Sequence, residues 1–166
     1  IVLMVGILLH KTPASLNVAF EEGVRNSFGI VLQFPIYAGI QGMMGSSGLV
    51  QVVANFFASI STPHTFVHWN YVSGAILNIF IPSSGGLFMV AGPAMAKAGA
   101  MLGVPGNETI IAFTAGETLS NIIQPFWAIA LLGVAGLKMK DIMGHCILVF
   151  IITTVIFNVC FALFFK

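Results

Sequence analysis

The chain has 166 residues, of which 58% are hydrophobic and only 7% charged, and its formal net charge is +1. A soluble domain carries about 25% charged residues because much of its surface faces water. This composition excludes an ordinary soluble enzyme, a disordered chain and a nucleic-acid binder, which needs a basic face. It predicts an all-α, polytopic membrane protein with a single membrane domain over 1–166, whose main partner is the lipid bilayer.

The first two segments differ in polarity. The apolar run 1–10 is too short to cross about 30 Å of hydrocarbon as a helix, so we interpret it as the end of a transmembrane helix whose earlier part lies upstream. Any site shared with that upstream half would be only half visible here. Segment 13–27 opens with Pro13, which suits a first helical turn, and pairs Glu21 with Arg25 at i,i+4. It predicts an amphipathic helix in the membrane interface, with a polar loop as the alternative.

Segment 28–48 is apolar but interrupted by Gln33, Pro35, Gln41 and several glycines and serines. It is either a short, kinked spanning helix or a re-entrant hairpin that dips into the membrane and returns. Irregular backbone survives at membrane depth only where it is buried in protein or lines a wet cavity. Counting basic residues does not decide, because both interpretations divide them four against two.

Segment 65–102 predicts a transmembrane helix that is broken near the membrane midplane. Only eleven residues run from Tyr71 to the one before Pro82, about 16 Å as a helix and therefore half a bilayer. Proline removes a backbone donor, and paired glycines permit a sharp path. A break at this depth offers hydroxyls, N–H groups and carbonyls to a substrate or ion. The candidate substrate-binding residues here are Ser83, Ser84, Gly85 and Gly86. The alternative is a short loop outside the membrane.

Segment 109–137 predicts a proline-kinked transmembrane helix. Four polar side chains recur at spacings of three, four and three on one face: Thr114, Glu117, Asn121 and Gln124. Pro125 cannot donate to the carbonyl of Asn121, which is therefore freed inside the helix. A polar stripe faces a pathway or a partner helix rather than lipid. We predict that Asn121 and Gln124 bind substrate and that Thr114 and Glu117 take part in ion coupling, with hydrogen-bonded packing between helices as the alternative.

Segment 142–165 carries no formal charge over 24 residues, about 36 Å as a helix, and predicts a transmembrane span. Its cysteines, Cys146 and Cys160, would lie about 21 Å apart, too far to bridge.

The hairpin interpretation of 28–48 groups the basic residues of the loop 138–141 with Lys11 and Arg25, and so places that loop in the cytoplasm.

Other chemistry has no clear signal. The four histidines show no metal-ligand grouping, and no nucleotide-binding or hydrolase motif stands in a suitable context. The chain lacks a nucleophile–base pair, so we expect no catalytic residue, no metal site and no cofactor.

Short motifs over nearly the whole chain resemble the C-terminal half of the bacterial short-chain fatty acid transporter family. They are Leu8-Leu9-His10-Lys11-Thr12-Pro13, Gln33-Phe34-Pro35-Ile36-Tyr37-Ala38-Gly39-Ile40-Gln41, Pro82-Ser83-Ser84-Gly85-Gly86 with Gly92-Pro93, Gly116-Glu117 with Asn121 and Gln124-Pro125-Phe126-Trp127, and Asp141-Ile142-Met143-Gly144. The resemblance implies an inner-membrane carrier for small monocarboxylates such as acetoacetate or butyrate. It also implies one of two inverted repeats of an ion-transporter class with re-entrant hairpins and broken helices, which favours the hairpin for 28–48.

The sequence departs from the family pattern in the expected site. The family has a third glycine where Ser84 stands, followed by His-Trp where this chain has Leu87-Phe88. Ala91 replaces a glutamine before Gly-Pro, and Leu119 replaces an aromatic residue. These differences bear on the identity of the substrate more than on the fold.

The residues and the resemblance together predict a secondary carrier of a small carboxylate. The coupling ion could be H⁺, carried by Glu117, or Na⁺, held by carbonyls around Ser83 to Gly86, and the sequence does not choose. The alternatives are a non-transporting scaffold or assembly subunit and a carrier of another small organic anion. The expected partners are the upstream half of the chain and a second copy in a homo-oligomer.

Overall fold

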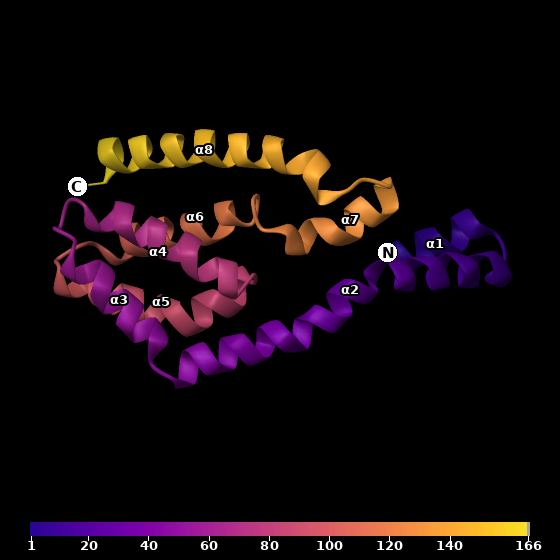
Figure 1. The fold of residues 1–166 in the computed structure, drawn as a ribbon, viewed down its shortest axis with the longest axis horizontal. Coiled ribbons are helices and arrows are strands. Elements are labelled where there is room, and N and C mark those ends of the chain that lie inside the picture. The colour runs from indigo at the N-terminus through magenta and orange to yellow at the C-terminus, as the bar shows by residue number, and fades with distance from the viewer. Residues whose placement is uncertain (166) are drawn as a thin grey trace.

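The computed structural model describes residues 1–165, apart from the side chains of Asn26, Ile30, Pro125, Ala130 and Val134. The described residues form helices and contain no strand, which confirms the all-α class. Figure 1 shows the elements in chain order: α1 (Val2–His10), α2 (Pro13–Ser46), α3 (Leu49–Ser59), α4 (Phe66–Phe80), α5 (Ser84–Met101), α6 (Gly106–Ser120), the 3₁₀ turn η1 (Pro125–Trp127), α7 (Ala128–Ala135) and α8 (Met139–Phe164).

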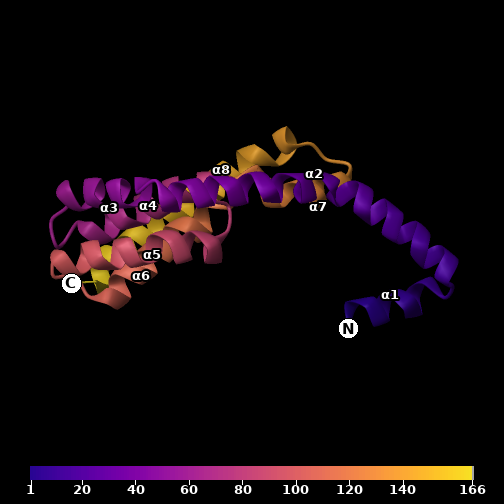
Figure 2. The same cartoon turned by 90° about the horizontal axis from the view of Figure 1, so that it is seen from below.

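Helix α2 is continuous, whereas the sequence predicted an interfacial helix over 13–27 followed by a hairpin over 28–48. The Thr12 hydroxyl caps its start by accepting from the Ser15 amide at 3.2 Å, and the helix runs through Pro35 to Ser46. The prediction of a hairpin was wrong because the chain leaves the helical conformation only at Gly48, with φ 75°. After that bend α3 carries on without reversing (Figures 1 and 2).

The chain reverses instead between α4 and α5. Ile81 leaves the helical conformation, Pro82 follows, and the Ser83 hydroxyl caps α5 by accepting from the Gly86 amide at 3.3 Å. The start of α4 lies beside the end of α5, where Phe66 contacts Gly99. The predicted break in 65–102 is therefore present, but its second arm returns beside the first instead of continuing across the membrane (Figure 1). We refer to Ile81–Ser83 as the hairpin tip.

Helix α6 runs parallel to α4 at unusually close range. An added methyl group at Gly74 of α4 would overlap the backbone oxygen of Phe113, and one at Gly116 of α6 would overlap the backbone oxygen of Tyr71. Small residues are what allow two helix backbones to approach this closely. The Asn70 amide adds a hydrogen bond of 2.7 Å to the carbonyl of Thr109. This contact fixes α6 to the first arm of the hairpin.

Segment 109–137 is interrupted rather than kinked. Helix α6 ends at Ser120, and the amides of Ile122 and Ile123 make tight bonds of 3.1 Å to the carbonyls of Leu119 and Ser120. Pro125 has no N–H with which to continue the α-helical pattern. We refer to 121–124 as the helix break.

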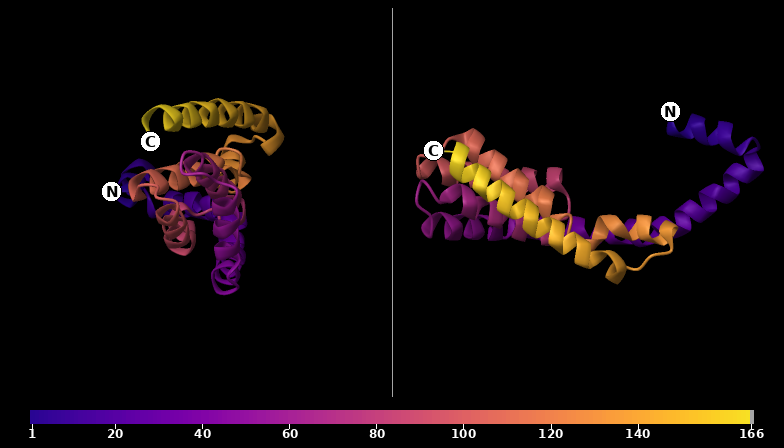
Figure 3. Two further views of the ribbon diagram at one scale, coloured as in Figure 1. Left: turned by 90° about the vertical axis from the view of Figure 1, so that its left-hand side faces the viewer. Right: turned by 90° about the horizontal axis from the view of Figure 1, so that it is seen from above.

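Helix α8 lies on the outside of the bundle (Figure 3). It begins three residues before the predicted span 142–165 and is, within residues 1–165, the one helix long and apolar enough to cross a membrane. Two side-chain pairs connect it to α4: His68 with Asn158 at 2.7 Å and Tyr71 with Thr154 at 2.8 Å. Within a largely apolar face, these bonds determine which side of α8 contacts the bundle.

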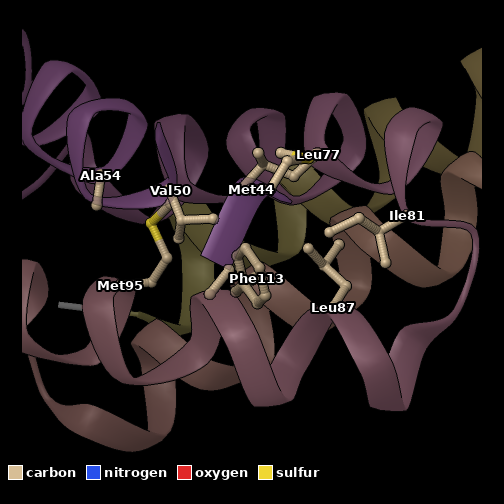
Figure 4. Packing of buried hydrophobic residues seen from close by; sticks show 9 residues of the cluster. Met44, Val50, Ala54, Leu77, Ile81, Leu87, Met95 and Phe113 are labelled. Carbon is tan, nitrogen blue, oxygen red and sulfur yellow. The ribbon is translucent and has the colours of Figure 1, made fainter. Parts of the chain in front are cut away.

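The apolar core occupies two positions along the bundle. Figure 4 shows the first, where Phe113 of α6 meets residues of α2, α3, α4 and α5. The second surrounds Phe66 and Tyr71 and reaches Phe161 of α8. The hairpin tip lies beside the first cluster, since Ile81 and Leu87 belong to it.

Candidate functional site

The hairpin tip and the helix break are connected through residues that flank them. The Trp127 indole N–H donates to the carbonyl of Pro82 at 3.1 Å. From the last turn of α4, the Asn78 amide donates to the Ser120 hydroxyl at 2.9 Å and to the Asn121 side-chain oxygen at 2.8 Å. Two interruptions that the sequence placed about forty residues apart thus form one structural unit.

Helix α2 supplies a third side of this unit. The Gln41 side-chain amide donates to the carbonyl of Gly86 at 3.1 Å. One to two turns earlier, the rings of Phe34 and Tyr37 meet Phe126 edge-to-face, with centroids 5.5 and 5.1 Å away. Of the predicted hairpin residues, Gln41 therefore reaches the site. The Gln33 Oε1 atom is buried without a hydrogen-bond partner, and Pro35 is exposed.

A pocket of about 90 Å³ lies between these three parts. Its lining is Phe34, Tyr37, Ala38 and Gln41 from α2, Ile81, Pro82 and Ser83 from the hairpin tip, and Phe126 after the helix break. Its polar end is at Ser83 and Gln41, next to the N-terminus of α5. Within the described residues, the amides of Ser84 and Gly85 have no hydrogen-bond acceptor, as expected for the first turn of a helix. The pocket thus joins hydrogen-bond donors to an aromatic surface.

Three buried oxygens near the α4–α6 contact have no hydrogen-bond partner in the described part of the chain: Asn78 Oδ1, Glu117 Oε2 and Gln124 Oε1. Their residues are 0, 2 and 6% exposed. Buried polar atoms are nearly always paired, and an unpaired one costs about 1–3 kcal/mol. A buried, unpaired oxygen of this kind is suited to bind a proton, a cation or a water molecule.

The predicted polar stripe is divided by the structure. Asn121 bonds Asn78, while Glu117 and Gln124 are buried with unpaired oxygens. The Thr114 hydroxyl instead donates to its own helix, at the carbonyl of Ile110, 2.8 Å away. Within the described residues, the Thr114 side chain therefore makes no hydrogen bond to the other members of the stripe.

Sequence reasoning missed the aromatic side of the pocket and Asn78. Phenylalanines are abundant in this chain, so Phe34 and Phe126 resembled packing residues. Asn78 carried a usable signal, since it is an uncharged polar residue one turn before Pro82 within an apolar run. Polar side chains in such runs face the protein interior.

Larger hollows lie elsewhere in the described structure. One of about 450 Å³ lies between α1 and the start of α2 and is lined by apolar residues and His10. Another of similar size, beside Met43 and Phe80, is almost wholly apolar. Residues 1–165 contain no group of three His, Cys, Asp or Glu residues close enough to bind a metal ion. The pocket at the hairpin tip adjoins the hydrogen-bond donors at the start of α5.

Comparison with known proteins matches the chain to one family. The family described as short chain fatty acid transporter matches residues 1–164. The chain belongs to this family. An Escherichia coli K12 protein named "Putative short-chain fatty acid transporter" is 40% identical over 162 residues, which cover 98% of this chain and 37% of that protein. A Haemophilus influenzae Rd protein of the same name is 39% identical over 157 residues, 95% of this chain and 35% of that protein. The chain thus spans little more than a third of these curated relatives. No solved structure matches it at a comparable level of significance.

Proposed function

We propose that this chain forms the substrate-holding part of a secondary carrier, not an enzyme, that moves small monocarboxylates such as acetoacetate or butyrate across the bacterial inner membrane. The observation that carries the proposal is the pocket at the meeting point of the hairpin tip and the helix break. Interrupted helices of this kind are where transporters bind substrates, because irregular backbone supplies polar groups inside the membrane. Family membership supports the substrate class.

The carboxylate binds at the start of α5. This helix has 18 residues, long enough for its N-terminal N–H groups and dipole to favour an anion. The amides of Ser84 and Gly85 donate to the carboxylate, and the Ser83 hydroxyl lies at the same end of the pocket. Hydroxyl and backbone donors suffice for a monovalent anion, so the absence of an arginine from the pocket lining is compatible with the role.

Coupling to a proton involves Glu117. Its carboxylate is buried, and within the described chain no basic side chain pairs with it. An unpaired buried carboxylate is disfavoured in its charged form. Proton binding at Glu117 and anion binding nearby would then favour each other, which is the thermodynamic requirement of symport. A sodium ion held by carbonyls around Ser83 to Gly86 is the alternative coupling ion.

The orientation follows from the basic residues. If α8 crosses the membrane along its length, the loop 138–141 lies toward the same end of the molecule as the α1–α2 connection and the first half of α2, while the α5–α6 connection lies at the other end (Figure 1). The first end carries Lys11 and Arg25, and Lys97 precedes the α5–α6 connection. Basic residues concentrate on the cytoplasmic side. We therefore place the loop 138–141 in the cytoplasm.

Counterflow of labelled butyrate in proteoliposomes of the full-length carrier tests the proposal. The wild type should accumulate label transiently against unlabelled butyrate. Ser83→Ala should raise the half-saturating concentration, since a charge-assisted hydrogen bond is lost, while Ser83→Thr should retain most activity and Ser46→Ala, at an exposed position outside the pocket, should match the wild type. Folded protein without counterflow of any small carboxylate would favour a scaffold or assembly subunit.

A further inference from the structure

We infer that three aromatic rings of the pocket, Phe34, Tyr37 and Phe126, together with Ala38, set the longest acyl chain that the carrier accepts. We call the three rings the aromatic wall. The inference rests on the proposed function and adds the residues that determine its specificity. It assigns the two ends of the pocket to the two ends of the substrate, with the carboxylate at the start of α5 and the alkyl tail against the rings.

The aromatic wall is held in position from two directions. Phe126 is 2% exposed and meets Phe34 and Tyr37 at interplanar angles of 84 and 81°, the edge-to-face geometry that aromatic pairs prefer. The ring of its neighbour Trp127 meets the Phe126 ring edge-to-face, with the ring centroids 5.0 Å apart, and the Trp127 indole N–H donates to the carbonyl of Pro82. The wall is therefore connected to the hairpin tip through Phe126 and Trp127.

The volume of the pocket limits the length of the tail. An apolar cavity of about 150 Å³ accommodates one benzene ring, with six carbons. The pocket here measures about 90 Å³, which on the same scale is room for about four carbons. With the carboxylate held by the donors at the start of α5, the three-carbon tail of butyrate fits this space, and the five-carbon tail of hexanoate exceeds it unless a ring moves.

Ala38 is the position at which the volume can be reduced. Phe34, Ala38 and Gln41 recur at helical spacing on the face of α2 that lines the pocket. A larger side chain at Ala38 would occupy the space of the tail, and a smaller one at Phe34 would extend that space. Opposite substitutions on a single helix face should therefore shift the length limit in opposite directions.

The test measures uptake of labelled acetate, butyrate and hexanoate by the full-length carrier in proteoliposomes. One methylene in an apolar pocket changes selectivity by about 10-fold or more. Phe34→Ala should therefore raise hexanoate uptake relative to butyrate at least 10-fold, and Ala38→Leu should lower butyrate uptake relative to acetate at least 10-fold. Phe28→Ala, on the same helix, 64% exposed and outside the pocket lining, is the matched control and should leave both ratios unchanged.

The possible failures are distinguishable. A wild type that transports butyrate, with both ratios unchanged in Phe34→Ala and Ala38→Leu, overturns this inference and leaves the proposed function intact. A folded wild type that transports none of the three acids overturns the proposed function itself. If Phe34→Ala does not assemble, Phe34→Leu replaces it. An unchanged hexanoate-to-butyrate ratio in Phe34→Leu together with an unchanged butyrate-to-acetate ratio in Ala38→Leu still overturns the assignment.

Discussion

Replacing Gly116 by alanine tests the close contact between α4 and α6. An added Cβ would overlap the backbone oxygen of Tyr71 and would lie 2.8 Å from its carbonyl carbon and 3.1 Å from the Ala75 nitrogen. All three are backbone atoms, so no side-chain rotation relieves the overlap and the two helices must separate. Overpacking of this kind costs about 1–3 kcal/mol, whereas alanine gains about 1 kcal/mol over glycine in a helix interior.

The expected balance is a net loss of stability with a functional consequence. Separation of α4 from α6 would lengthen the bonds from Asn78 to Ser120 and Asn121 and loosen the hairpin tip against the helix break. Thermal unfolding of the full-length carrier in detergent should show a lower Tm. About 1 kcal/mol corresponds to about 2–4 °C for a domain of 150–250 residues, and to less in a longer chain. Butyrate affinity should fall with it.

Gly144→Ala is the matched control for Gly116→Ala. Gly144 lies within α8, and an added Cβ there meets nothing within 4 Å. The same substitution should therefore leave Tm unchanged or raise it. If Gly116→Ala melts no lower than the wild type while Gly144→Ala behaves as expected, the backbone contact between α4 and α6 is not as close as described, and the reasoning is refuted.

The remaining predictions concern coupling and the pocket. Glu117→Gln should abolish butyrate accumulation driven by a pH gradient yet retain butyrate exchange, because the amide keeps the shape of the side chain but cannot titrate. Glu22→Gln, at an exposed position, is the control. Unchanged accumulation in Glu117→Gln would favour sodium or no coupling ion. Trp127→Phe removes the hydrogen bond to Pro82 and should raise the half-saturating butyrate concentration about 5- to 10-fold, as expected for loss of about 1 kcal/mol or slightly more; an unchanged value would show that this bond does not position the hairpin tip. Ser83→Cys should react with a small polar thiol reagent, more slowly when butyrate is bound; labelling that saturating butyrate leaves unaffected would place the tip outside the binding site. The 166-residue chain alone should show no butyrate uptake, since a site at a repeat interface needs both halves; uptake by the isolated chain would contradict that dependence.

Several features of this protein follow from the sequence because they depend on local chemistry. A charged fraction of 7% determines the membrane class, and a long uncharged run determines α8. Proline acts on its own neighbourhood by removing a donor and excluding the helical path, so the interruptions at Pro82 and before Pro125 could be located from the sequence. Ser83 lies at the first of these interruptions and Asn121 at the second, and the bonds of Trp127 to Pro82 and of Asn78 to Asn121 connect the two regions.

The direction of the chain after each interruption was decided only by tertiary packing. The break at Pro82 does not specify whether the next helix continues or returns, and the return of α5 depends on contacts such as that between Gly99 and Phe66. The glycines of α2 before Gly48 all keep helical backbone, so the helix stays continuous. A glycine can also adopt other conformations, so the sequence alone does not require this outcome. The aromatic wall likewise joins Phe34 to Phe126, about ninety residues apart. Aromatic residues serve both packing and binding, and only their positions in the folded chain separate the two roles.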